Sequence, residues 1–378
     1  MATGVLFFIC SICFFLMALI AVFNPTRVNV TANLWVGLFY VSAGCMTLNP
    51  AINSFGLQSR FAFLTAVDEL GYLAMMPALY LAIVQFTTPA SKFSAKAYLH
   101  LLPVTLFAII HIAALSKHNF LTIQQAEIVF ILFKTGIRCQ LLIYWILAYR
   151  RIINHQKHIR LIIADVEPVS LNWLKYLLLV LGGMLLLFFV TSIFNISVNA
   201  IVPCIYLAGS LGILYYSLAQ KEIYPYQPEE LQSISEIFIE IEEKTKTAKQ
   251  RFANEEATQL RARLEYLMTT EKLYLDPELN LPQLAQRMPV SVNDLSFLLN
   301  DIIGLNFFQF INAYRVEEAK QLMLSEQYMH LNLLGIAYNA GFNSKTTFNT
   351  AFKKETGSSP SQFLKNQKGA RQQVSSAV

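Results

Sequence analysis

Long apolar runs separated by short polar stretches fill the first 220 residues of the chain, and more polar helical patterns follow them. A helix needs about 20 apolar residues to cross the hydrocarbon core of a bilayer. Seven runs come close to that length, so the pattern predicts an all-α protein that begins with a bundle of seven transmembrane helices. The runs are residues 3–23, 34–52, 61–86, 97–115, 126–149, 171–194 and 198–219.

The composition supports a membrane domain joined to a water-soluble one. Hydrophobic residues make up 55% of the chain, charged residues only 14%, and the mean hydropathy is +0.44. Soluble proteins carry about a quarter charged residues, so the average excludes a wholly soluble chain. The five cysteines all lie inside apolar runs, which predicts neither a disulfide framework nor a metal site. No catalytic or phosphate-binding motif is present, so we expect no cofactor and no enzymatic activity.

Basic residues in the short loops predict the orientation of the bundle. They concentrate on one side: Arg27, Lys92, Lys96, Arg150, Arg151, Lys157 and Arg160. The opposite side has only Arg60 and Lys117. We therefore expect an amino terminus outside the cell and, after seven crossings, a carboxy-terminal part in the cytoplasm. The first run lacks a basic start and a small-residue cleavage site, so we interpret it as a membrane span and not as a cleavable signal peptide.

Charged residues inside apolar spans are costly unless they are paired or solvated, so they are candidate functional residues. Five titratable residues fall in the outer half of the predicted bundle: Asp68, Glu69, His111, Lys134 and Arg138. One interpretation is an outward-facing pocket for an unknown small-molecule or lipid signal. The other is an acid–base pair that holds two helices together. The sequence leaves both open.

Residues 221–265 are predicted to form an amphipathic helical connector. Apolar residues recur at helical spacing around Ile234 and Phe238 and again around Leu264 and Leu267. Such a seam either packs on a second copy of the chain, which would make residues 229–268 a homodimer contact, or packs on its own domain.

The carboxy-terminal domain, residues 266–378, contains two predicted helix-turn-helix units. In the first, Asn280 and Gln283 form a capping box, Ser291 caps the following helix, and Leu295, Leu298 and Ile302 are expected to point inward. A longer helix from Asn306 to Leu324 links this unit to the second.

The second unit occupies residues 333–363 and carries an exposed polar stripe. Gly341 is predicted to end the first helix in a left-handed turn, and Asn343 or Ser344 to cap the next. Phe348 and Phe352 lie four residues apart and are expected to be buried. The exposed positions suit phosphates and base edges of DNA: Lys345, Thr346, Asn349, Thr350, Lys353 and Lys354.

At these residues the domain resembles the DNA-binding domain of the AraC/XylS family of bacterial transcription regulators. The second unit matches at Ile336, Ala337, Gly341, Phe342, Ser344, Phe348, Phe352, Lys353, Lys354, Gly357 and Pro360. The first unit and the linking helix match at Leu281, Leu284, Ala285, Ser291, Leu295, Ser296, Gly304, Phe307, Tyr314 and Arg315. The resemblance implies two motifs that enter successive major grooves, with Asn293 and Ser296 as the DNA-facing residues of the first.

Several residues depart from the family pattern. The first recognition helix has Phe297–Leu299 where a basic residue is common, and it also carries Asp294 and Asp301. Leu364 stands where a basic residue often follows the last motif. The first motif should therefore bind phosphate weakly, and the second should supply most of the affinity.

These observations predict a membrane-bound, one-component transcription regulator in the bacterial cytoplasmic membrane, with DNA, membrane lipid and an unidentified signal as partners. The alternative is a membrane transporter or membrane enzyme whose helix-turn-helix domain has lost DNA binding and serves protein interaction.

Overall fold

Every regular element in the described part of the chain is helical, which confirms the predicted all-α fold. The computed structural model describes residues 2–61, 63–88, 95–115, 123–194, 201–226, 228–243, 252 and 254–375. The chain packs as two compact units. The first consists of Met1–Asn154 and Leu171–Ile223, and the second of His155–Ser170 and Tyr224–Val378.

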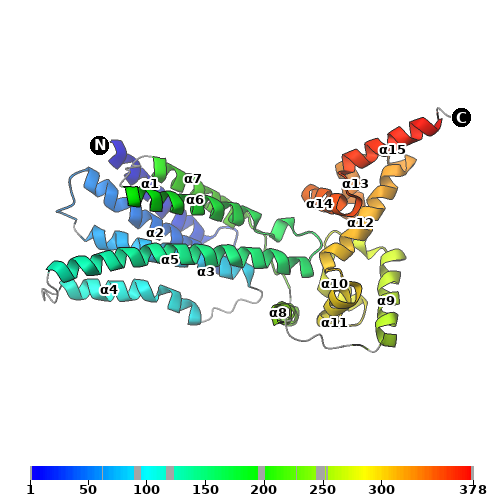
Figure 1. Ribbon diagram of the computed structural model, residues 1–378, viewed down its shortest axis with the longest axis horizontal. Helices are drawn as coiled ribbons and strands as arrows, with labels where there is room; N and C mark the ends of the chain where they lie inside the picture. The colour runs from blue at the N-terminus through cyan, green and yellow to red at the C-terminus, as the bar shows by residue number, and fades with distance from the viewer. Residues whose placement is uncertain are drawn as a thin grey trace. The chain divides into compact units, whose positions relative to one another are not determined.

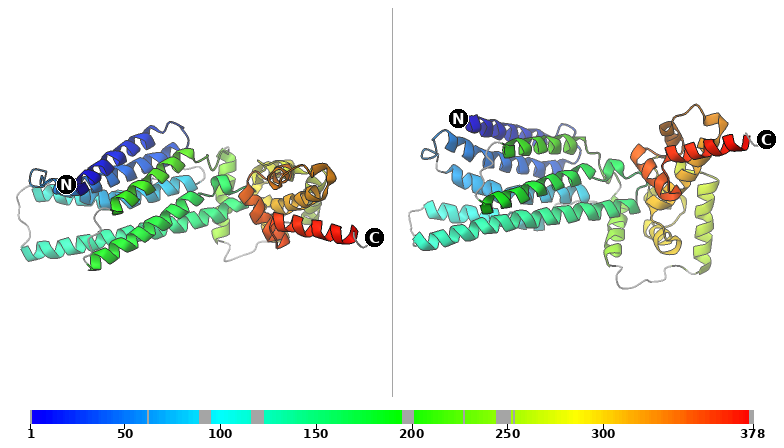
Figure 2. Two further views of the ribbon diagram at one scale, coloured as in Figure 1. Left: turned by 90° about the horizontal axis from the view of Figure 1, so that it is seen from above. Right: turned by 45° about the horizontal axis from the view of Figure 1, so that its top comes forward.

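The helices of the first unit correspond to the predicted apolar runs, with shifted ends, and lie side by side in Figures 1 and 2. They are α1 (Ala2–Phe23), α2 (Val30–Ser54), α3 (Leu64–Thr87), η1 (Ala95–Leu101), α4 (Leu102–Leu115), α5 (Ile123–His158), α6 (Asn172–Phe194) and α7 (Ile201–Ala219).

Four helical segments in the described residues are long and apolar enough to cross a membrane: Thr3–Phe23, Val30–Ser54, Leu64–Thr87 and Ile131–Leu161. Three shorter apolar helical segments accompany them: Tyr98–Ile109, Asn172–Leu187 and Leu207–Ala219. The count of seven crossings therefore stays a prediction.

Helix α2 has the least apolar sequence of the predicted spans, and its packing explains why. It packs against both α1 and α3, and its buried residues include Asn33 and Ser42. A side chain at Gly71 of α3 would come within 2.7 Å of the backbone oxygen of Ser42, so the two helices approach closely. Small and polar residues on α2 thus face neighbouring helices. At such contacts close approach and hydrogen bonding matter more than hydrophobicity.

The second unit contains the connector and both helix-turn-helix motifs. Its elements are η2 (Ile159–Leu161), η3 (Glu167–Val169), α8 (Pro228–Glu243), α9 (Asn254–Thr269), η4 (Leu273–Leu275), α10 (Leu281–Arg287), α11 (Val292–Phe297), η5 (Leu298–Ile303), α12 (Phe307–Leu324), η6 (Glu326–Tyr328), α13 (Leu333–Asn339), α14 (Lys345–Thr356) and α15 (Pro360–Ser375). Figure 1 shows α12 running between the α10–α11 pair and the α13–α14 pair.

Two details of this unit differ from the prediction. Residues 155–170 were expected to belong to a first domain of residues 1–220, but they pack with the carboxy-terminal unit. Ile302 was expected to point inward but is 39% exposed. It lies in η5, a π-helical turn whose wider winding shifts side chains away from the α-helical face.

The described helices of the connector pack on their own domain, as one of the two alternatives predicts. Ile234 and Phe238 of α8 are buried, as are Leu264 and Leu267 of α9. Helix α8 packs against α11, and the Phe238 ring stacks on the His158 ring at 4.7 Å. The apolar seam of the connector is therefore already covered within one chain.

Candidate nucleic-acid interface

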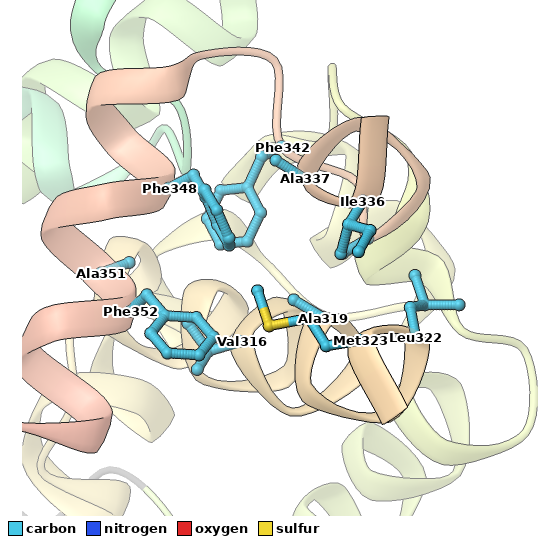
Figure 3. Packing of buried hydrophobic residues seen from close by; sticks show 11 residues of the cluster. Val316, Ala319, Leu322, Met323, Ile336, Ala337, Phe342, Phe348, Ala351 and Phe352 are labelled. Carbon is cyan, nitrogen blue, oxygen red and sulfur yellow. The ribbon is translucent and has the colours of Figure 1, made fainter. Parts of the chain in front are cut away.

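Helix α14 is held by an aromatic core that fixes which of its faces is exposed. Phe342, Phe348 and Phe352 are at most 1% exposed, and neighbouring rings meet edge to face at 5.1 and 5.5 Å. Figure 3 shows Phe348 and Phe352 pointing from α14 toward α12, where Val316 and Ala319 meet them. These rings fix which side of α14 faces the core.

The turn before α14 also follows the sequence prediction. Gly341 has a φ of +88°, and a Cβ there would lie 2.4 Å from the backbone oxygen of Tyr274. Only glycine fits this position. Ser344 is the cap, since its Oγ accepts a hydrogen bond from the backbone N–H of Thr347 at 3.2 Å.

All six predicted contact residues of α14 lie on its exposed face: Lys345, Thr346, Asn349, Thr350, Lys353 and Lys354. Three ammonium groups and two hydroxyls flank one amide on this surface. Lysine and hydroxyl groups bind phosphate, and an asparagine side chain can bond the edge of adenine. Residues 330–371 carry six Lys and Arg against Glu355 alone, so the surface attracts polyanions.

The first motif has the same local architecture but a different surface. Its helix α10 has the predicted capping box, and Ser291 caps α11. Ser296, a predicted DNA-facing residue, is only 6% exposed. Asn293, the other one, donates a hydrogen bond from Nδ2 to Oε2 of Glu236 in α8 at 3.0 Å.

An apolar contact also joins the first motif to the connector. The ring of Phe297 lies 5.8 Å from that of Phe252, and residues 291–303 contain no lysine or arginine. The structure therefore brings the contact residues of α14 together on an open surface, whereas it places Asn293 of the first motif against the connector and buries Ser296.

Helix α12 sets the geometry between the motifs through a buried arginine. Arg315 is 0% exposed, and its Nε and Nη2 donate to the backbone oxygens of Tyr274 and Asp276 at 2.7 and 2.8 Å. Burial lowers the pKa of Arg315 to about 10, while the nearby Asp165 and Asp276 carboxylates favour its charged form. It stays protonated at neutral pH and ties the chain before α10 to the linking helix.

Glu318 of α12 makes a second, more exposed tie. It accepts hydrogen bonds from Nζ of Lys272 at 2.9 Å and from the hydroxyl of Tyr274 at 2.7 Å. Partial burial raises the pKa of Glu318, but these two hydrogen bonds and the Lys272 charge together bring it below its usual value. The carboxylate is thereby kept ionised.

Sequence reasoning missed two residues of this region. Thr347 lies in the first turn of α14 but is 4% exposed, and it donates a hydrogen bond to Asp165. Asp165 belongs to the segment between α5 and α6, 182 positions away. No local pattern relates the two residues, because only the tertiary fold brings them together.

In the first unit, four of the five candidate signal residues can be placed by their side chains. Nζ of Lys134 in α5 pairs with the buried carboxylate of Glu69 in α3. Asp68 accepts a hydrogen bond from Nδ2 of Asn49 in α2 at 3.3 Å. Arg138 lies one turn after Lys134 and is half-buried. The side chain of His111 lies outside the described residues.

This arrangement joins α2, α3 and α5 through polar groups, as the helix-pairing interpretation requires. One oxygen of each acid, Oδ1 of Asp68 and Oε2 of Glu69, is buried without a hydrogen-bond partner in the described part of the chain. These two oxygens could therefore each accept a hydrogen bond that no described protein group donates.

Comparisons with known proteins agree with the geometry of the second unit. Residues 284–366 match the family described as "Helix-turn-helix domain". Over 88 residues, 23% of the chain, the sequence is 33% identical to the arabinose operon regulatory proteins of Salmonella typhimurium and Escherichia coli. The carboxy-terminal domain is an AraC-type helix-turn-helix domain.

The match covers 30% and 29% of those two regulators, so the chain shares less than a third of their length. No solved structure matches this chain. The similarity thus concerns the AraC-type domain and carries no information on the apolar helices before it.

Proposed function

We propose that this protein is a membrane-bound, one-component transcription regulator that binds specific DNA sequences through its AraC-type domain and senses a signal through its apolar helices. The exposed polar face of α14 carries the proposal. It combines the phosphate-binding and base-reading groups of a recognition helix on one open surface, in a domain whose relatives regulate an operon.

The apolar surface of the first unit supports the membrane part of the proposal. Large apolar side chains stand exposed on its helices, among them Leu16 of α1 at 54%, Leu132 of α5 at 66% and Leu186 of α6 at 66%. Water-soluble monomers rarely expose large contiguous apolar patches, whereas lipid-facing helices do. The excess of basic residues in one set of loops supports a cytoplasmic position for the AraC-type domain, where it would reach DNA.

The polar cluster of Glu69 and Lys134 is the proposed signal-sensing site. A ligand that competes for either charge would loosen the pairing of α3 with α5, because buried ion pairs depend on both partners. We expect Lys134→Met to alter the DNA affinity of the full chain, whereas Lys117→Met, in a loop predicted from the sequence, should not. Equal affinities of the parent and both variants would remove this cluster from the sensing mechanism.

DNA selection tests the function directly. The full chain, reconstituted in lipid nanodiscs, is incubated with a random-sequence duplex library, and retained duplexes are sequenced. The full chain is needed because residues 155–170 pack within the AraC-type unit. The parent should enrich a defined sequence, and the triple variant Lys345→Ala/Asn349→Ala/Lys353→Ala should enrich none.

Salt and a matched triple variant complete the design. Replacing Gln259, Arg261 and Arg263, which are exposed on α9, by alanine should leave enrichment intact. Binding by the parent should weaken steeply between about 50 and 200 mM salt, because phosphate contacts release counterions. Equal retention by the parent and the α14 variant would reject DNA recognition and favour a protein-interaction module.

A further inference from the structure

The segment between α5 and α6 contains a short stretch that is built into the AraC-type unit. Residues 159–165, here called the strap, follow directly after the last residue of α5. Ile159, Ile162 and Ala164 are 0% exposed. A loop that merely connected two membrane helices would be solvated, so this degree of burial indicates a structural role.

The strap is hydrogen-bonded to three helical regions of the DNA-binding unit. The backbone oxygen of Ile162 accepts from the N–H of Leu281, at the start of α10, at 2.9 Å. The backbone oxygen of Ala164 accepts from Nδ2 of Asn312 in α12 at 2.8 Å. The third contact is the bond from Oγ1 of Thr347 in α14 to Oδ1 of Asp165, at 2.7 Å. The strap therefore touches both motifs and the helix between them.

The carboxylate of Asp165 is buried and has few hydrogen-bonding or charged partners. It is 7% exposed, and its Oδ2 has no hydrogen-bond partner among the described residues. The guanidinium of Arg315, itself fully buried, is close enough to interact with its charge. Burying a carboxylate is unfavourable unless specific partners compensate it, so the hydrogen bond from Thr347 is a principal compensation.

The position of Thr347 gives this bond its significance. Thr347 lies in the first turn of α14, where its N–H also donates to the capping Ser344. Its neighbours Lys345 and Thr346 are exposed and belong to the proposed DNA contact surface. A constraint on Thr347 therefore constrains the turn that presents both residues.

We propose that Asp165 is a positioning residue of the DNA interface, which fixes the first turn of α14 through Thr347 in the orientation that presents Lys345 and Thr346 to DNA. This inference rests on the proposed function, because it concerns what orients the same DNA-contact surface of α14. The strap continues covalently from α5, the helix that carries Lys134, so the apolar helices are joined to this contact without passing through the connector.

Hydrogen exchange of the full chain in nanodiscs tests the positioning without DNA. Asp165→Ala and Thr347→Val should each speed amide exchange in residues 344–350 by about 5- to 30-fold, the range expected when one buried partner is lost. Asp165→Asn keeps an acceptor for the Thr347 hydroxyl and should preserve slow exchange. The double variant Asp165→Ala/Thr347→Val should exchange no faster than the single variants, because both remove the same bond.

Thr356→Val is the matched control. Thr356 lies at the other end of α14, and its hydroxyl bonds to the backbone of Phe352 in the same helix. This variant should leave exchange in residues 344–350 unchanged. Additive effects in the double variant, or fast exchange in Asp165→Asn, would overturn the positioning role.

The affinity of the same variants for the selected DNA sequence forms the second arm. Asp165→Ala and Thr347→Val should lose site-specific affinity by a similar factor, and Asp165→Asn should restore it. If the parent selects no sequence, the proposed function fails, while the exchange data still decide whether Asp165 positions α14. If exchange follows the expected pattern but affinity stays unchanged in all variants, Asp165 stabilises the helix without positioning the interface.

Discussion

The two helix-turn-helix motifs share their local folding signals and differ in their surfaces. Each begins with an asparagine cap, has a serine cap on its second helix and ends at a glycine with positive φ: Asn280, Ser291 and Gly304 in the first motif, and Asn332, Ser344 and Gly357 in the second. Five residues after the capping serine stands buried Ser296 in the first motif and exposed Asn349 in the second.

The difference shows that one backbone architecture supports two kinds of contact. Caps and turns fix the helices, whereas the residues between them decide what the second helix binds. In the first motif, contacts to α8 and Phe252 replace the basic groups that bind phosphate. The second motif keeps a free polar face. We therefore expect changes in the second motif to affect DNA binding and the equivalent changes in the first to affect only packing.

The largest expected effect comes from the aromatic core of the second motif. Phe352→Ala should destabilise the motif by about 3–5 kcal/mol, because it leaves a cavity among the packed rings. Hydrogen exchange in α13 and α14 measures the loss, and DNA binding should fall with it. Tyr338→Ala, which changes an aromatic side chain of the same motif that is 54% exposed, is the control and should cost at most about 0.5 kcal/mol.

A single lysine of α14 tests the contact with phosphate. Lys353→Ala should weaken DNA binding by about 1.5–3 kcal/mol, as expected for a bond to a charged group. The slope of log affinity against log salt should also decrease by about 1. The control, Lys320→Ala, removes a lysine of α12 that is paired with Glu317, and it should change neither quantity. An unchanged salt slope in Lys353→Ala would exclude a phosphate contact at this position.

The two serine caps provide a direct comparison of the motifs. Ser344→Ala and Ser291→Ala should each destabilise their helix by about 1 kcal/mol, because each removes the acceptor of one backbone N–H. Hydrogen exchange should rise locally in both variants. DNA affinity should fall only in Ser344→Ala. An equal loss of affinity in Ser291→Ala would mean that the first motif also faces DNA.

The smallest effect is expected from an added charge in the first motif. Phe297 and Thr350 stand at the same distance after their capping serines, so Phe297→Arg and Thr350→Arg are matched changes. Thr350→Arg should strengthen non-specific DNA binding and steepen its salt dependence. Phe297→Arg should change affinity by less than about 0.5 kcal/mol, since the connector covers that side of α11. A gain in both variants would contradict this coverage.

Much of the fold followed from local pattern. Apolar runs located the helices of the first unit, and predicted caps located the starts of three helices in the second: Asn280, Ser291, and Asn343 or Ser344, of which Ser344 is the cap. Helix boundaries were less accurate: α5 continues to His158, nine residues beyond the predicted span. That extension is polar, so hydropathy could not reveal it, although no helix-breaking residue interrupts it.

The sequence by itself determined the helical fold, the two motifs and the exposed face of α14, because caps, glycine turns and apolar spacing act over a few residues. Only the tertiary structure decided that α8 covers the first motif, that Glu69 pairs with Lys134 and that Asp165 meets Thr347. These contacts join residues 57 to 182 positions apart. Their partners are chosen by the packing of whole helices, which no local spacing encodes.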